Sequence, residues 1–118
     1  MASPLRVLLV EDEALVAMTI EDMLGELGAT VVATAGRLED ALDKAGSLAF
    51  DVAILDINLH GRPSVPVAEL LRQRGLPFIV ATGYGDAMLP EPLRAVPVLA
   101  KPFQRGDLAR VLAAAKPP

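Results

Sequence analysis

Residues 50–59 read FDVAILDINL, and the apolar run from Val52 to Leu55 inside this stretch predicts a short buried strand. A run of about four to eight apolar residues between polar ones is typical of a strand that is covered on both faces in a parallel sheet. The run is followed directly by a carboxylate, Asp56. Because open α/β sheets bind their ligands at the carboxyl ends of the strands, Asp56 is a candidate functional residue. It could also simply start a turn or cap the next helix.

Similar signals alternate along the rest of the chain. Apolar or β-branched runs predict further strands at residues 5–10, 30–35, 77–82 and 96–100. Helical spacing of apolar residues, each time followed by a glycine, predicts helices at residues 14–27, 38–45 and 65–74. A last helix carries the apolar stripe Leu108, Val111, Leu112 and Ala115. Strands that alternate with helical segments in this way predict an α/β fold, a five-stranded parallel sheet with helices on both faces.

The fourth helical segment differs from the others. It follows Asp86 and contains Pro90 and Pro92. Proline in a helix interior costs about 3 kcal/mol or more, because it removes a hydrogen bond and clashes with the preceding turn. We therefore expect this helix to be short, irregular or mobile.

The composition fits one domain over residues 1–118 and argues against several classes of function. The chain is 53% hydrophobic, which is enough for a folded core. It has no cysteine, which excludes disulfides and cysteine zinc sites and favours a reducing cytoplasm. The net charge of −4, with one Tyr, three Phe and no Trp, argues against a nucleic-acid partner. No apolar run approaches the roughly 20 residues that span a membrane, so we expect no membrane insertion.

Five polar residues fall at the carboxyl ends of the predicted strands, and parallel strands bring those ends to one edge of the sheet. They comprise three acids, one hydroxyl and one ammonium: Glu11, Asp12, Asp56, Thr82 and Lys101. Three clustered carboxylates raise one another's pKa unless a cation joins them. Oxygen ligands without His or Cys favour a hard ion, and Mg²⁺ fits because it keeps waters that a phosphate can displace.

This set of residue types suits phosphoryl transfer. Mg²⁺ and Lys101 can neutralise oxygens of a transferring phosphoryl group, Thr82 can donate a hydrogen bond to another oxygen, and Asp56 can act as a carboxylate nucleophile. Each residue alone has a plainer interpretation: the first acids could form a charged helix start, the threonine could be an ordinary strand residue and the lysine a loop residue. The only histidine, His60, is interpreted as a surface residue. The joint placement of all five favours the phosphoryl chemistry.

The same residues lie in motifs that make essentially the whole chain resemble a response-regulator receiver domain. The motifs are VLLVEDE at residues 7–13, DVAILDINL at 51–59, AT at 81–82 and AKPF at 100–103. The resemblance implies a flavodoxin-like receiver fold with the strand order 2-1-3-4-5. It also implies a partner that supplies the phosphoryl group, a sensor histidine kinase or a histidine phosphotransfer protein, and a downstream protein target.

The resemblance further implies a role for each site residue. Asp56 would be the phosphoacceptor, Thr82 the switch hydroxyl, and Lys101 the partner of a phosphoryl oxygen. The magnesium ligands would be Glu11, Asp12, Asp56 and the main-chain carbonyl of Asn58. The bond before Pro102 would be cis, although X–Pro bonds in folded proteins are cis in only about 5–6% of cases.

A subgroup is also indicated. The stretch PFIVATGYGD at residues 77–86 is similar to the "FAT GUY" receivers of alphaproteobacteria, which are often stand-alone proteins working with sensor histidine kinases. Val80 departs from that motif, which has Phe at this position.

A second departure concerns signal output. Many receivers carry an aromatic residue where this chain has Val98, and that ring moves inward together with the switch threonine. We hypothesise that the signal passes instead through Tyr84 and the proline-containing fourth segment, by ordering of a loose element. The positions two residues after the phosphoacceptor and after the switch threonine, Asn58 and Tyr84, are expected to tune the lifetime of the phosphoryl group.

Three other interpretations compete with a phosphoryl-accepting module. A small phosphatase with an aspartate nucleophile would carry Asp-x-Asp, whereas this chain has Asp56-Ile57-Asn58 and lacks the second acid. A pseudo-receiver that only binds partners is disfavoured by the intact set of acids, Thr82 and Lys101. A fragment of a longer regulator stays open. We expect a cytoplasmic, bacterial, single-domain response regulator without an output domain, which catalyses only its own phosphorylation and dephosphorylation.

Overall fold

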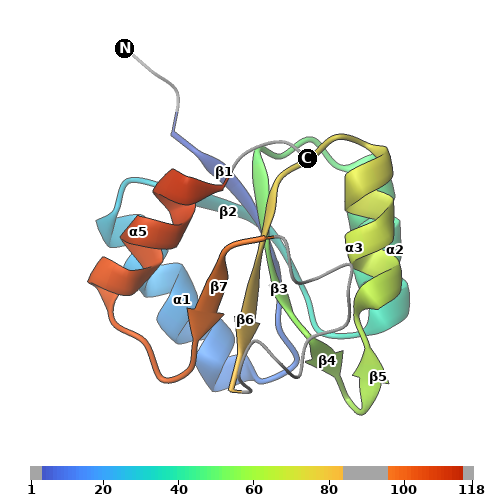
Figure 1. Ribbon diagram of the computed structural model, residues 1–118, viewed down its shortest axis with the longest axis horizontal. Helices are drawn as coiled ribbons and strands as arrows, with labels where there is room; N and C mark the ends of the chain where they lie inside the picture. The colour runs from blue at the N-terminus through green and yellow to red at the C-terminus, as the bar shows by residue number, and fades with distance from the viewer. Residues whose placement is uncertain (1–3, 84–95, 116–118) are drawn as a thin grey trace.

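The computed structural model describes residues 4–83 and 96–115, which form a five-stranded parallel sheet between two pairs of helices (Figure 1). The strands lie in the order β2-β1-β3-β6-β7. Counted within this sheet alone, the order is 2-1-3-4-5, so the implied receiver topology is confirmed. The strand bounds are β1 Arg6–Val10, β2 Thr30–Ala35, β3 Val52–Asp56, β6 Phe78–Thr82 and β7 Val98–Ala100.

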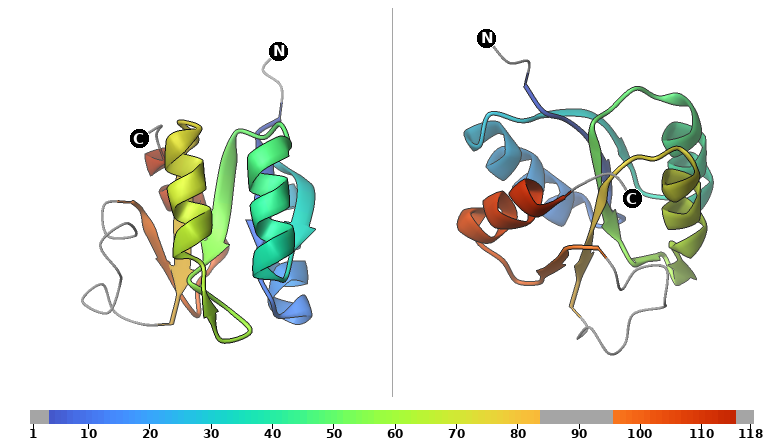
Figure 2. Two further views of the ribbon diagram at one scale, coloured as in Figure 1. Left: turned by 90° about the vertical axis from the view of Figure 1, so that its right-hand side faces the viewer. Right: turned by 45° about the horizontal axis from the view of Figure 1, so that its top comes forward.

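Two of the described helices cover each face of the sheet (Figure 2). Helices α1 (Ala14–Glu26) and α5 (Arg105–Ala114) pack on one face, and α2 (Leu38–Ser47) and α3 (Val65–Gln73) pack on the other. None of the helices in the described ranges has the length and apolar character needed to cross a membrane. The segment with Pro90 and Pro92, expected as an irregular fourth helix, lies outside the described residues.

Strand β3 is at the centre of the sheet, between β1 and β6, and its apolar residues are buried on both faces. Ala53 and Leu55 join the apolar cluster beneath α2 and α3, whereas Val52 and Ile54 join the cluster beneath α1 and α5. The run is therefore continuously apolar rather than alternating, as expected of a strand covered by helices on both sides. The ladder with β6 continues through Asp56, so this carboxylate is held at the end of a rigid element.

The segment expected as a loop after β3 forms a short antiparallel hairpin instead. Strand β4 (Asn58–Leu59) pairs with β5 (Arg62–Pro63). Its two-residue tip has positive φ at both positions, 51° at His60 and 82° at Gly61. Positive φ at both central residues is typical of a type I′ turn, the turn whose twist suits a tight hairpin.

Two predicted boundaries were wrong by two residues, and four others by one. Helix α2 continues through Gly46, which was expected to end it, and stops at Ser47. A Cβ atom at Gly46 would lie 3.5 Å from the Leu70 side chain, so this glycine lies where α2 approaches α3. Strand β7 begins at Val98 rather than at Val96. The bond between Lys101 and Pro102 is cis, as the resemblance implied.

Ser64, the N-cap residue of α3, is fully buried, and within the described ranges its hydroxyl has no hydrogen-bond partner. An N-cap serine contributes stability through a side-chain bond to the first turn, which is absent here. Leaving a buried hydroxyl unpaired costs about 1–3 kcal/mol. We therefore predict that Ser64→Ala raises the free energy of unfolding by about 1 kcal/mol, measured by urea denaturation.

The control for this measurement is Ser47→Ala. The Ser47 hydroxyl is exposed and donates to the Asp43 carbonyl at 2.7 Å, so its loss should change stability little. A Ser64→Ala variant that is less stable than the natural chain by about 1 kcal/mol or more would mean that the hydroxyl has a partner in solution.

Candidate functional site

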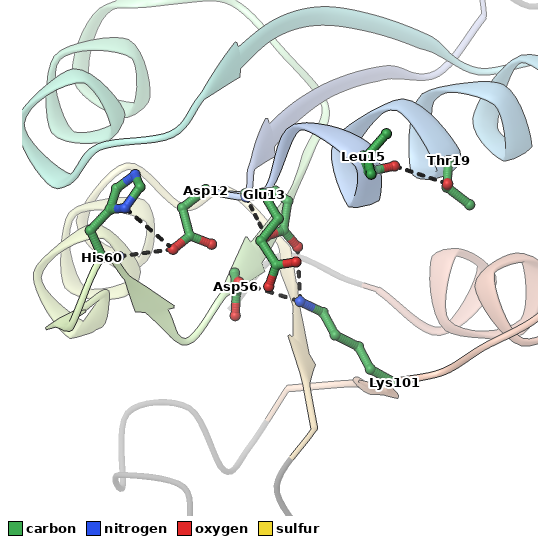
Figure 3. A network of polar contacts seen from close by, with 8 residues as sticks. Asp12, Glu13, Leu15, Thr19, Asp56, His60 and Lys101 are labelled. Carbon is green, nitrogen blue, oxygen red and sulfur yellow. Dashed lines mark hydrogen bonds and ion pairs between the residues drawn. The ribbon is translucent and has the colours of Figure 1, made fainter.

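The five polar residues predicted at the strand ends gather at one edge of the sheet, and Figure 3 labels three of them, Asp12, Asp56 and Lys101. Asp56 is the last residue of β3 and Thr82 the last of β6, while the other three follow β1 and β7 directly. Four of them, Asp12, Asp56, Thr82 and Lys101, line a hollow of about 390 Å³ that Asn58 lines as well. The sequence therefore identified the residues that the fold brings together.

Lys101 links two of the acids. Its Nζ lies 2.9 Å from Glu11 Oε1 and 3.3 Å from Asp56 Oδ2. The Glu11 side chain is only 1% exposed, and its other oxygen accepts the main-chain N–H of Glu13 at 3.1 Å. Burial lowers the pKa of Lys101, but its hydrogen bond to Glu11 and the charge of Asp56 raise it by more, so the ammonium stays charged.

The Asp56 carboxyl has a raised pKa of about 6. Burial is the main cause and the neighbouring charge of Glu11 the second, while the ammonium of Lys101 acts in the opposite direction. At neutral pH the carboxyl is mostly ionised but costly to keep so. A partly buried carboxylate of this kind is stabilised by any reaction or ligand that neutralises its negative charge.

Asp12 is held differently. Its Oδ2 accepts the main-chain N–H of His60 at 2.9 Å, and His60 Nδ1 lies 3.9 Å from the same oxygen. Burial raises the pKa of Asp12, but hydrogen bonds, led by the one from His60, lower it by more. Asp12 is therefore a stable carboxylate beside the less stable one of Asp56.

The donor set fits a hard divalent cation. Ligand oxygens of Glu11, Asp12 and Asp56 lie within 4.8 Å of one another. Three carboxylates with Lys101 among them leave negative charge to be compensated, and carboxylate oxygens are the ligands that Mg²⁺ prefers. Asn58 lines the same hollow from the first position of β4, a place that suits its expected role as a further ligand.

The remaining positions singled out in the sequence are Thr82, Tyr84 and Val98. Thr82 is buried, and its carbonyl accepts the main-chain N–H of Lys101 at 2.8 Å, which ties the ends of β6 and β7 together. Tyr84, expected to tune lifetime and to carry the signal, lies outside the described residues. Val98 is partly buried and packs against the cluster beneath α2 and α3.

Sequence reasoning missed two features. His60 is a surface residue, as predicted, with a side chain 62% exposed, but its main chain contacts the site. The signal was the dipeptide His60-Gly61 in a segment that was assigned to a loop. The second feature is an apolar groove of about 420 Å³ beside Lys101, where Leu15 is 79% exposed and Phe103 and Pro102 form part of the wall.

Comparison with known proteins identifies the same kind of domain. The sequence model of the response regulator receiver domain matches residues 7–113. The transcriptional regulatory protein PdtaR of Mycobacterium tuberculosis is 36% identical over 111 residues, which cover 91% of this chain and 54% of that protein. The chain thus spans about half the length of the curated relatives it matches first.

Solved structures agree. The solution structure of SdrG from Sphingomonas melonis Fr1 superposes with a TM-score of 0.86 at 43% identity, covering 97% of this chain and 98% of that one. The crystal structure of the response regulator PhyR from Brucella abortus superposes with a TM-score of 0.82 at 28% identity, covering 96% of this chain and 48% of that one.

Proposed function

Because the chain belongs to the response regulator receiver domain family, we propose that it accepts a phosphoryl group on Asp56 from a histidine donor in a two-component system. The observation that carries this proposal is the placement of Asp56 at the end of β3, where it lines an open hollow. Lys101 Nζ lies 3.3 Å from Asp56 Oδ2. This arrangement puts a carboxylate nucleophile beside a cation where a phosphoryl group can enter.

The residues divide the work of one in-line displacement. An oxygen of Asp56 forms a bond to the phosphorus while the phosphorus–nitrogen bond of the donor phosphohistidine breaks, and the imidazole leaves with the electron pair. Lys101 neutralises one phosphoryl oxygen, and the Thr82 hydroxyl donates to another. Water later hydrolyses the acyl phosphate and restores the Asp56 carboxylate.

The same acids would hold the metal. Glu11, Asp12 and Asp56 would bind Mg²⁺ together with the carbonyl of Asn58, and the bound ion would neutralise charge on the phosphoryl oxygens. Support comes from the mutual closeness of the three carboxylates and from the raised pKa of Asp56, which burial and the charge of Glu11 hold at about 6.

The surroundings of the site support a protein donor. Exposed Leu15 on α1 lines the groove beside Lys101, and Met18, three residues further along α1, is also exposed, so apolar side chains lie near the reactive edge. Exposed apolar side chains at one place mark protein contact surfaces. We propose that a sensor histidine kinase or a histidine phosphotransfer protein docks there, in the cytoplasm.

For output, we propose contact with a downstream protein target. The motif at residues 77–86 supports the "FAT GUY" subgroup, whose members are often stand-alone receivers.

We expect one phosphoryl adduct when the purified chain is incubated with acetyl phosphate and Mg²⁺, read by intact-mass spectrometry. The Asp56→Asn variant should gain none, because an amide cannot act as the nucleophile. Omission of Mg²⁺ with a chelator present should reduce the adduct by on the order of tenfold or more, since the site then lacks most of its positive charge.

The outcome separates the competing functions. An adduct that survives in Asp56→Asn would place the acceptor elsewhere. No adduct from acetyl phosphate or from any phosphorylated kinase would favour a pseudo-receiver. Sustained turnover of a phosphate ester would favour the small phosphatase, although Asn58 stands where such enzymes carry a second acid.

A further inference from the structure

The hairpin formed by β4 and β5 reaches across to the metal-binding edge through its tip (Figure 3). The main-chain N–H of His60 donates to Asp12 Oδ2 at 2.9 Å. The imidazole is a weaker contact, since its Nδ1 lies 3.9 Å from that oxygen and the side chain is 62% exposed. The polar link between the hairpin and Asp12 is therefore mainly a main-chain one.

The hairpin is fixed to the rest of the fold at two points and is closed at its base by a main-chain hydrogen bond. Leu59 is 1% exposed and packs in the cluster beneath α2 and α3. Arg62 forms an ion pair with Glu39 at the start of α2. At the base, the N–H of Ser64 donates to the Ile57 carbonyl at 2.9 Å. The place of the tip N–H thus depends on Leu59 and Arg62, which do not line the hollow of the metal site.

We propose that this hairpin is the positioning element of Asp12, with His60 as the positioning residue. The N–H of His60 occupies Oδ2, and the other carboxylate oxygen lies on the side away from His60, toward Asp56 (Figure 3). The carboxylate of Asp12 is thereby held in one orientation, with its other oxygen available to a divalent cation. This inference rests on the proposed metal site and adds that cation affinity depends on the hairpin.

Linkage gives the inference a second consequence. If the hairpin raises cation affinity, the bound cation must stabilise the hairpin by the same factor. The amide of His60 should therefore exchange with solvent more slowly when Mg²⁺ is present, whereas an amide in a remote helix should change little.

The main test compares two substitutions at the tip by titrating the intact chain with Mg²⁺ alone and following binding by calorimetry. His60→Pro removes the N–H and cannot adopt positive φ, so the Kd for Mg²⁺ should rise on the order of tenfold, as for other residues that orient a metal ligand. His60→Asn keeps the N–H and suits a type I′ turn, so its Kd should stay close to that of the natural chain.

A second pair of variants acts from a distance. Arg62→Gln breaks the ion pair with Glu39 and should raise the Kd about twofold to fivefold through the loosened hairpin. Arg105→Gln is the matched control, because it breaks the similarly exposed Arg105–Glu26 pair on the other side of the sheet and should leave the Kd unchanged. Thermal unfolding of all four variants checks that each is folded.

Failure of this inference is distinct from failure of the proposed function. A natural chain that binds no Mg²⁺ would overturn the proposed metal site and the inference with it. Equal Mg²⁺ affinity in the natural chain, His60→Pro and Arg62→Gln would overturn the inference alone. A loss in His60→Asn as large as in His60→Pro would also overturn it, because the imidazole would then be the group that matters.

Discussion

The Asp56→Asn variant is expected to unfold at a higher temperature than the natural chain near neutral pH in the absence of Mg²⁺. Burial and the charge of Glu11 raise the pKa of Asp56 from 3.8 to about 6. At neutral pH the ionised carboxylate of Asp56 therefore destabilises the folded chain. Asparagine has the shape of the protonated acid and carries no charge. The free energy of unfolding of Asp56→Asn should exceed that of the natural chain by about 1–3 kcal/mol, because each unit of pKa shift corresponds to about 1.4 kcal/mol.

The pH dependence follows from the direction of the shift. Below the unfolded pKa of 3.8, Asp56 is protonated in both states and contributes nothing to the difference. Between 3.8 and about 6 the folded chain binds more protons than the unfolded chain, so this group makes stability fall as pH rises. Above a pH of about 6 both states are ionised at Asp56, and its effect on stability no longer changes with pH. The advantage of Asp56→Asn should therefore be small at acid pH and grow to its full size at neutral pH.

Chemical denaturation across this pH range, with a chelator present, measures the effect. The control is Asp51→Asn, because hydrogen bonds from the main chain and side chain of Arg6 lower the pKa of Asp51, so its loss should not stabilise the fold. Added Mg²⁺ should narrow the gap between the natural chain and Asp56→Asn. A natural chain as stable as Asp56→Asn at every pH would mean that Asp56 is not strained by burial.

The sheet and the set of site residues were predictable because both depend on short-range signals. The run from Val52 to Leu55 is apolar on both faces, and only a central strand under helices on two sides accommodates that pattern. Once the strands are parallel, their carboxyl ends share an edge, so Asp56 and Lys101 meet although 45 residues separate them.

The parts that were missed depend on contacts that no local pattern encodes. Gly46 looks like a helix stop, but α2 continues through it at the place where the helix approaches Leu70 of α3. The hairpin after β3 contains only two residues in each strand, too few for a periodic signal. The contact of His60 with Asp12 involves a main-chain N–H, which every residue except proline carries, so residue type alone could not indicate it.

The second large effect is expected for Lys101→Met. Methionine fills similar space but leaves Glu11, with a side chain 1% exposed, without the ammonium at 2.9 Å. Removing one partner of a buried ion pair leaves an uncompensated charge, which costs about 3 kcal/mol or more. The variant should therefore unfold about 10 °C below the natural chain at neutral pH without Mg²⁺. Lys44→Met, which breaks the more exposed pair with Asp40, is the matched control and should cost far less.

The background of Asp56→Asn tells which acid Lys101 mainly compensates. If the ammonium served Asp56 alone, its removal would cost little once that charge is gone. Glu11 is the closer partner, at 2.9 Å against 3.3 Å for Asp56, and its side chain is 1% exposed against 13%. We therefore expect more than half of the stability lost in Lys101→Met to be lost in the double variant as well, measured as a double-mutant cycle.

If the double variant were instead as stable as Asp56→Asn alone, Glu11 would be held by the N–H of Glu13 and would not need Lys101. Lys101 would then be held mainly by Asp56, the proposed phosphoacceptor, and could turn toward a phosphoryl group once the charge of Asp56 is neutralised.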